Sequence, residues 1–164
     1  MTNIYQLPSD LPIPQDEGST NHLKEMKLPH ISLNATNGEE INFGDLKGKW
    51  VIYCYPMTGQ PNVALPDGWD QIPGARGCTP QSCSFRDHYQ ELQALGAEVV
   101  GLSVKSSEYQ KALDLPTFLA AGMTFLKRLT LITNNGLIEA VHYPIFPSDS
   151  DPVWVIDYLK SHER

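Results

Sequence analysis

Two apolar runs with a helical pattern between them constrain the fold of this chain most. Residues 50–55 (Trp-Val-Ile-Tyr-Cys-Tyr) are typical of a strand buried on both faces, and residues 98–104 form a second such run. Between them, Phe85, Tyr89 and Leu92 fall on one face of a helix. A strand, a helix and a strand in this order connect by a right-handed crossover, so the two strands are predicted to be parallel neighbours.

A β-hairpin is predicted ahead of this unit. Residues 30–36 and 39–43 alternate apolar and polar side chains, and Asn37-Gly38 stands between them. This dipeptide suits a type I′ turn, because both central residues of that turn need a positive φ.

The C-terminal part predicts a second hairpin and a closing helix. Residues 128–133 and 137–143 flank another Asn-Gly dipeptide and are expected to pair antiparallel. Asp151 and Pro152 suit the N-cap and the first position of a last helix. A short helix is also expected over residues 106–113. Together these elements predict an α/β protein, a thioredoxin-like three-layer sandwich with an added N-terminal β-hairpin.

Length and charge limit the classes of function. A chain of 164 residues suits one domain, predicted over residues 28–164, after a loose proline-bearing arm over residues 1–27. The net charge of −7 argues against nucleic acid or an anionic membrane as a partner. The first residues resemble no secretory signal and no apolar run is long enough to span a membrane, so a cytoplasmic location is expected.

Two of the three cysteines, Cys78 and Cys83, stand at the predicted start of the central helix. A helix N-terminus presents unpaired N–H groups and the positive end of the helix dipole, which favour a thiolate. A thiol with a pKa near ~8.5 is barely ionised at neutral pH, whereas one lowered to about 6 is mostly thiolate. The pair is therefore predicted to be a redox centre, while Cys54, inside a strand pattern, is expected to be part of the core.

The register of the helix start stays open in the sequence. If the helix begins at or just before Cys78, the Cα atoms of Cys78 and Cys83 are ~8.6 Å apart, beyond the ~7 Å limit for a disulfide. The first turn must then unwind before the thiols meet. If Thr79 is the N-cap and Pro80 follows as N1, the cysteines occupy positions that touch across a helix start. A zinc site that adds His88 is disfavoured, because residues five apart share no helix face.

Residues 77–87 (Gly-Cys-Thr-Pro-Gln-Ser-Cys-Ser-Phe-Arg-Asp) resemble the active-site signature of the peroxiredoxins, specifically the Q-type group also called bacterioferritin comigratory protein. Residues 28–50 resemble the opening hairpin of that family and the turn into its first central strand. Residues 51–56 resemble the strand that leads to the active site, and residues 128–132 the strand that carries its arginine. The resemblance covers most of the chain from about Lys27 onward.

The resemblance implies a thiol-dependent peroxidase that reduces hydrogen peroxide or organic hydroperoxides. Cys78 would be the peroxidatic cysteine that becomes a sulfenic acid, and Cys83 the resolving cysteine that closes an intramolecular disulfide. Arg128 would lie close to the thiolate, lower its pKa and stabilise charge on the peroxide oxygens. No metal or organic cofactor is implied. Thioredoxin or a similar dithiol would be the reductant, and the protein would be a monomer or homodimer.

The sequence departs from the family pattern in two places. The family places a hydroxyl residue three positions before the peroxidatic cysteine, where this chain has Ala75. Thr58, which precedes a Pro/Gly-rich insertion, and Thr79 are the candidates for that role. Between Val104 and Arg128 the family has an additional strand, and this stretch predicts none, which would leave a sheet edge exposed or open to a partner.

Two other functions are compatible with a thiol pair in this fold. A thioredoxin-like protein disulfide oxidoreductase would reduce insulin and ignore peroxide, although that class usually carries Cys-x-x-Cys rather than Cys-x4-Cys. A redox-responsive interaction protein would lack turnover and change its partner binding on oxidation.

Overall fold

The computed structural model describes residues 15–34, 38–55, 78–102, 113, 115–120, 123–145 and 148–162, and only the backbone of residues 78–80, 118–120, 123–125 and 148. The elements in chain order are β1 (Ser32–Asn34), β2 (Glu40–Asn42), η1 (Phe43–Asp45), β3 (Lys49–Cys54), α1 (Cys78–Asp87), α2 (Tyr89–Ala94), β4 (Ala97–Leu102), β5 (Thr117–Ala120), β6 (Met123–Leu126), β7 (Leu129–Asn134), β8 (Leu137–His142), η3 (Ser148–Ser150) and α4 (Asp151–Ser161).

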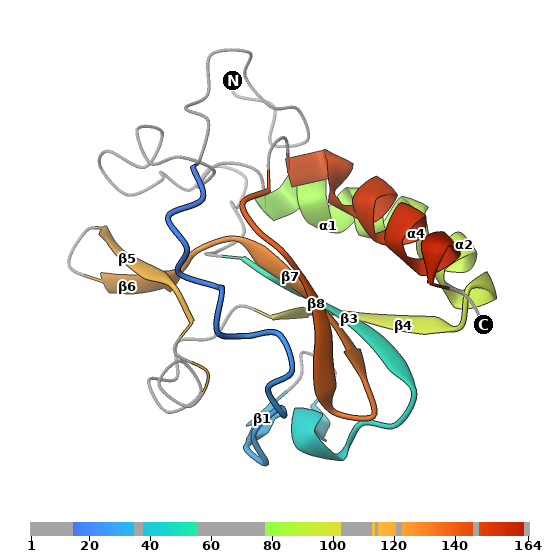
Figure 1. Ribbon diagram of the computed structural model, residues 1–164, viewed down its shortest axis with the longest axis horizontal. Helices are drawn as coiled ribbons and strands as arrows, with labels where there is room; N and C mark the ends of the chain where they lie inside the picture. The colour runs from blue at the N-terminus through green and yellow to red at the C-terminus, as the bar shows by residue number, and fades with distance from the viewer. Residues whose placement is uncertain are drawn as a thin grey trace.

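A four-stranded sheet in the order β4-β3-β7-β8 forms the centre of the fold (Figure 1). β3 runs parallel to β4 and antiparallel to β7, and β7 pairs antiparallel with β8. Asn135 and Gly136 between β7 and β8 have φ of 52° and 83°, as a type I′ turn requires. The predicted βαβ unit and the C-terminal hairpin are confirmed. β1 and β2 confirm the N-terminal hairpin, whose residues 35–37 lie outside the described residues.

The two faces of the sheet bury different side chains, because successive residues of a strand point to opposite faces. Helices α1, α2 and α4 cover one face, as Figure 1 shows. The core on that side includes Val51, Phe85, Leu92, Ile132, Val155 and Leu159. The core on the other side includes Leu23, Leu28, Ile52, Cys54, Leu113, Leu126 and Leu131. The sheet therefore has a core on each side, as the predicted three-layer arrangement requires.

Residues 15–27 of the predicted N-terminal arm are packed rather than loose. The Glu25 N–H donates to the Ile138 carbonyl at 2.7 Å, and the Ile138 N–H donates to the Met26 carbonyl at 2.9 Å. Leu23 is fully buried. The proline content that suggested a loose segment did not reveal this pairing with β8, because the partner strand lies more than a hundred residues away in the sequence. Residues 1–14 lie outside the described residues.

Truncating Leu23 tests how much the packed segment contributes to stability. Leu23→Ala is expected to lower the free energy of unfolding by about 2–5 kcal/mol, because it leaves a cavity in the core. Urea denaturation of wild type and variant measures the difference. Val153→Ala is the matched control, since Val153 is 49% exposed, and should change stability by no more than about 0.5 kcal/mol. A Leu23 variant as stable as this control would mean that the segment adds nothing to the fold.

The sequence patterns missed part of the middle of the chain. β5 and β6 pair antiparallel as a separate two-stranded sheet, in the stretch where no strand was predicted. Their four-residue lengths are too short for a clear period of alternation, and a proline precedes β5. Among the described strands, β4 and β8 are the two outer strands of the central sheet. The helix predicted over residues 106–113 lies outside the described residues except for Leu113.

The helical segment after β3 is divided in two. α1 ends at Asp87 and α2 begins at Tyr89, with His88 between them at φ −102° and ψ 7°. Gly96 follows at φ +84°, a conformation that favours glycine just past a helix end.

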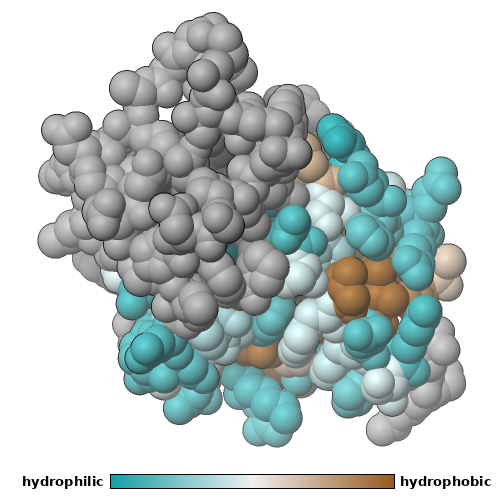
Figure 2. Space-filling view, turned by 90° about the horizontal axis from the view of Figure 1, so that it is seen from above, coloured by the Kyte–Doolittle hydropathy of each residue, from teal (hydrophilic) through white to brown (hydrophobic). Residues whose placement is uncertain are grey.

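None of the helices in the described residues has the length and apolar character that crossing a bilayer requires. Figure 2 shows that the described surface seen from above is mostly hydrophilic, with small hydrophobic areas between polar side chains.

Candidate active site

Helix α1 begins at Cys78. Of the two registers compatible with the sequence, the structure therefore has the one in which the helix starts at or just before this cysteine, with Thr79 and Pro80 inside the first turn. Helix geometry separates the Cα atoms of Cys78 and Cys83 by ~8.6 Å. A disulfide between them requires the first turn of α1 to unwind.

The buried face of α1 is set by residues that follow Cys78 at helical spacing. Gln81 and Phe85 lie three and seven positions after it, on the same face, and they are 0% and 2% exposed. The Phe85 ring stacks on Tyr53 of β3, with ring centroids 4.4 Å apart. Cys83 belongs to another face and is half-buried. Cys78 and Cys83 therefore belong to different faces of α1.

Gln81 connects the first turn of α1 to Arg128. The Arg128 side chain is 5% exposed and comes directly before β7, and its Nη1 donates to Gln81 Oε1 at 2.5 Å. The other end of the Gln81 amide donates through Nε2 to Asp151 Oδ2 at 2.8 Å. The guanidinium predicted to serve the thiol site thus contacts the helical turn that carries Cys78.

Asp151 is a fully buried carboxylate with three polar partners. Besides Gln81, the Thr130 hydroxyl donates to its Oδ2, and His142 Nδ1 lies 2.7 Å from its Oδ1. The His142 ring stacks on Trp154, with centroids 4.2 Å apart. These hydrogen bonds satisfy a carboxylate that would otherwise be costly to bury.

The predicted N-cap role of Asp151 is wrong. Asp151 lies inside α4 as its first residue, after Ser150 at the cap position. Its carboxylate oxygens hold side chains of α1, β7 and β8 instead of the free N–H groups of α4. The local pattern of aspartate before proline is the same in both cases, so only the packing of these elements distinguishes the two roles.

Cys54 is part of the core, as predicted. Its side chain is fully buried, and burial together with the charge of Asp151 raises the pKa of its thiol to about 12. The Cys54 thiol therefore stays protonated at neutral pH and is a poor nucleophile.

Tyr53 is a neighbour of the site that sequence reasoning missed. Burial raises the pKa of its phenol, and a side-chain hydrogen bond with Ser82 opposes that effect. Gly101 of β4 stands beside Tyr53 in the parallel register, and a Cβ there would lie 2.7 Å from the Tyr53 ring. The one hint in the sequence is Gly101 inside a strand pattern, because a glycine there often marks a place where another group closely approaches the backbone.

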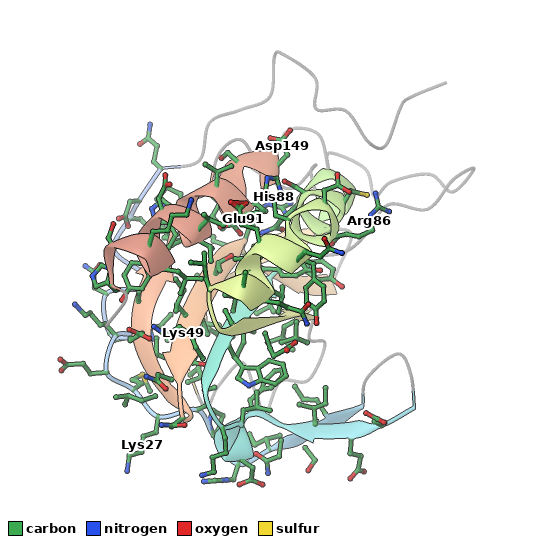
Figure 3. All side chains as sticks on the ribbon, turned by 90° about the vertical axis from the view of Figure 1, so that its right-hand side faces the viewer. Lys27, Lys49, Arg86, His88, Glu91 and Asp149 are labelled. Atoms are coloured by element: carbon green, nitrogen blue, oxygen red, sulfur yellow. The ribbon has the colours of Figure 1, made fainter. Side chains whose placement is uncertain are left out.

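Two other polar side chains near the cysteine pair, those of Arg86 and His88, have partners outside the Gln81, Arg128 and Asp151 contacts. Arg86 pairs with the neighbouring Asp87 at 3.5 Å, and Figure 3 shows its side chain pointing away from α4. His88 Nδ1 lies 2.8 Å from the Ser84 carbonyl. Of the two candidates for the hydroxyl near Cys78, Thr58 lies outside the described residues, as does the side chain of Thr79. Across the part of the chain that the structure describes, no three His, Cys, Asp or Glu residues are grouped to hold a metal ion.

Comparison with known sequences relates part of the chain to one family. Over 85 residues it is 39% identical to the chloroplastic peroxiredoxin Q of Sedum lineare, a match that covers 51% of this chain and 38% of that protein. It is 36% identical over 87 residues to peroxiredoxin bcp1 of Schizosaccharomyces pombe, covering 52% and 37% of the two chains. The matched segment is less than half of each of these relatives. No protein-family model matches the chain.

Comparison with solved structures extends the likeness to most of the chain. Peroxidoxin BcpB from Mycobacterium tuberculosis aligns over 87% of this chain and all of its own length, with a TM-score of 0.62 at 17% identity. The bacterioferritin comigratory protein of Xanthomonas campestris, studied for its alkyl peroxide reduction, aligns over 98% and 99% of the two chains, with a TM-score of 0.59 at 17% identity. The predicted thioredoxin-like fold is confirmed.

Proposed function

We propose that this chain, a relative of the Q-type peroxiredoxins, is a thiol-dependent peroxidase that reduces hydrogen peroxide or organic hydroperoxides through Cys78. The observation that supports this most is the contact of Arg128 with Gln81, one turn along α1 from Cys78. A cysteine at a helix start and a buried cation that contacts the same helical turn are the two features that stabilise a thiolate.

In the first chemical step the Cys78 thiolate attacks one oxygen of the peroxide. The sulfur electron pair forms an S–O bond while the O–O bond breaks, so the thiolate is oxidised to a sulfenic acid and the peroxide is reduced. The leaving oxygen takes a proton and departs as water or an alcohol. Arg128 donates hydrogen bonds to the peroxide oxygens, and its positive charge stabilises the negative charge that develops on them.

In the second step Cys83 attacks the sulfur of the sulfenic acid. An S–S bond forms and the sulfenic oxygen leaves as water. Because α1 holds the two Cα atoms ~8.6 Å apart, the first turn unwinds before this step. Thioredoxin or a similar dithiol then returns two electrons through a mixed disulfide and regenerates both thiols.

Peptide mapping after oxidation tests the assigned roles of the cysteines. One equivalent of peroxide without reductant is expected to give a Cys78–Cys83 disulfide and to leave Cys54 reduced, because Cys54 is buried and its thiol pKa is about 12. Cys83→Ser should stop at a sulfenic acid, which a dimedone label detects. A map in which only Cys54 is linked would contradict the assignment.

Several finer properties belong to the same proposal. We place the protein in the cytoplasm, as a monomer or homodimer that needs no metal or organic cofactor. Thr58 or Thr79 would supply the hydroxyl near Cys78. The alkyl peroxide reduction described for the Xanthomonas campestris protein supports organic hydroperoxides as one substrate class. Initial rates with hydrogen peroxide and with an alkyl hydroperoxide would rank the substrates.

A further inference from the structure

We infer that Asp151 is a positioning residue for the thiol site, which orients Arg128 through the amide of Gln81. The inference rests on the proposed function for the role of Arg128, and it concerns a carboxylate whose partners among the described side chains are Gln81, Thr130 and His142. It is carried by a chain of hydrogen bonds from Asp151 of α4 to Gln81 of α1 and from Gln81 to Arg128.

The chemistry of the three groups fixes the orientation of the Gln81 amide. An ionised carboxylate only accepts hydrogen bonds and a guanidinium only donates them, whereas an amide has one end of each kind. With its NH2 toward Asp151 and its oxygen toward Arg128, Gln81 satisfies both partners. If the amide turned over, two donors would face each other and two acceptors would face each other. The carboxylate therefore selects the amide orientation that offers Arg128 an acceptor.

Asp151 is itself held in place from the sheet. Thr130 stands two residues after Arg128, and its hydroxyl donates to Asp151 Oδ2. His142 of β8 approaches the other carboxylate oxygen at 2.7 Å. The carboxylate is fully buried, so water does not compete for these bonds. The Asp151 carboxylate, at the start of α4, is thus held by side chains of α1, β7 and β8. Through its hydrogen bond to Gln81 it also holds the amide that contacts Arg128.

Two possible roles of Asp151 predict opposite changes in the pKa of the Cys78 thiol when Asp151 loses its charge. Asp151 could act as a charge alone, or it could orient Arg128. A nearby negative charge disfavours a thiolate; at Cys54 burial is the larger cause of the raised thiol pKa, and the charge of Asp151 adds to it. If Asp151 acted only as a charge, Asp151→Asn would lower the pKa of the Cys78 thiol. If it orients Arg128, the asparagine can present its own NH2 group to Gln81, the amide can turn, and the hydrogen bond from Arg128 to Gln81 Oε1 is lost. The pKa of the Cys78 thiol would then rise.

The pH dependence of thiol alkylation by iodoacetamide distinguishes the two effects. In a Cys83→Ser background, Asp151→Asn is expected to raise the pKa of Cys78 and to slow its reaction with hydrogen peroxide about tenfold at neutral pH. Asp149→Asn is the matched control, since it removes an exposed carboxylate two residues earlier and should change neither quantity. A folded Asp151→Asn variant whose Cys78 pKa falls or stays unchanged would overturn the inference.

A second variant keeps the test decisive if Asp151→Asn does not fold. Gln81→Met preserves the length of the side chain and removes both of its hydrogen bonds, so it should also raise the pKa of Cys78; an unchanged pKa would overturn the inference. Where both variants fold, the double variant should match Gln81→Met alone, because Asp151 acts through Gln81. If the double variant instead showed the sum of the two single changes in the pKa of Cys78, Asp151 would not act through Gln81. Alkylation needs no peroxidase turnover, so a wild type without turnover would refute the proposed function separately.

Discussion

Replacement of Cys78 by serine is expected to lower the rate of peroxide reduction by a factor of about 10³ or more, as the loss of a nucleophile does in other enzymes. A serine hydroxyl is not ionised at neutral pH, so it lacks the electron pair that attacks the O–O bond. The measurement is peroxide loss with thioredoxin as the electron donor, with wild type and variant side by side.

Cys54→Ala is the control for this experiment. Cys54 is the buried thiol whose pKa is about 12, and its removal should leave peroxide reduction unchanged. If Cys78→Ser retained turnover, the proposed function would be wrong. Reduction of insulin without peroxide reduction in the wild type would favour a protein disulfide oxidoreductase. Absence of both activities, with binding that changes on oxidation, would favour an interaction protein.

Arg128→Met is expected to slow the oxidation of Cys78 by peroxide about 10²-fold, the scale of losing one oriented donor at a site of developing charge. The substitution keeps much of the side-chain length and removes the guanidinium that contacts Gln81. Stopped-flow tryptophan fluorescence after mixing with peroxide measures the first step directly. Arg86→Met is the matched control, because the Arg86 side chain is 72% exposed and pairs with Asp87 outside the site.

Stability measurements separate a catalytic Arg128 from a structural one. Removing the guanidinium leaves Gln81 Oε1 without its donor, which costs about 1–3 kcal/mol in a buried site. A variant that loses stability and oxidises at the wild-type rate would show that Arg128 only holds the fold. Arg128→Lys keeps the charge without the planar fork, so an intermediate rate is expected.

Local patterns predicted the central elements of the fold. The apolar runs around Val51 and Val99 became the parallel pair β3 and β4, since continuous apolar runs indicate strands buried on both faces. The turn at Asn135-Gly136 was predicted from two residues, because few other dipeptides accept a positive φ at both positions. The apolar run of each strand and the dipeptide of the turn are properties of residues that are neighbours in the sequence.

The predictions that failed depended on distant partners. The segment around Leu23 was expected to be loose, and it packs because β8 offers hydrogen bonds to its backbone. Asp151 was expected to cap its own helix, and it instead binds side chains of three other elements. In each case the local sequence allows both outcomes, and tertiary packing decides between them.

The sequence by itself determined that a cysteine stands at a helix start after a buried strand, because helix periodicity, strand composition and the active-site signature are local properties. Only the tertiary structure decided which groups meet beside that helix turn. Gln81 contacts Arg128 across 47 positions and Asp151 across 70, and no periodic pattern records such pairs. They form because the sheet and two helices pack so that one buried amide lies between a guanidinium and a carboxylate.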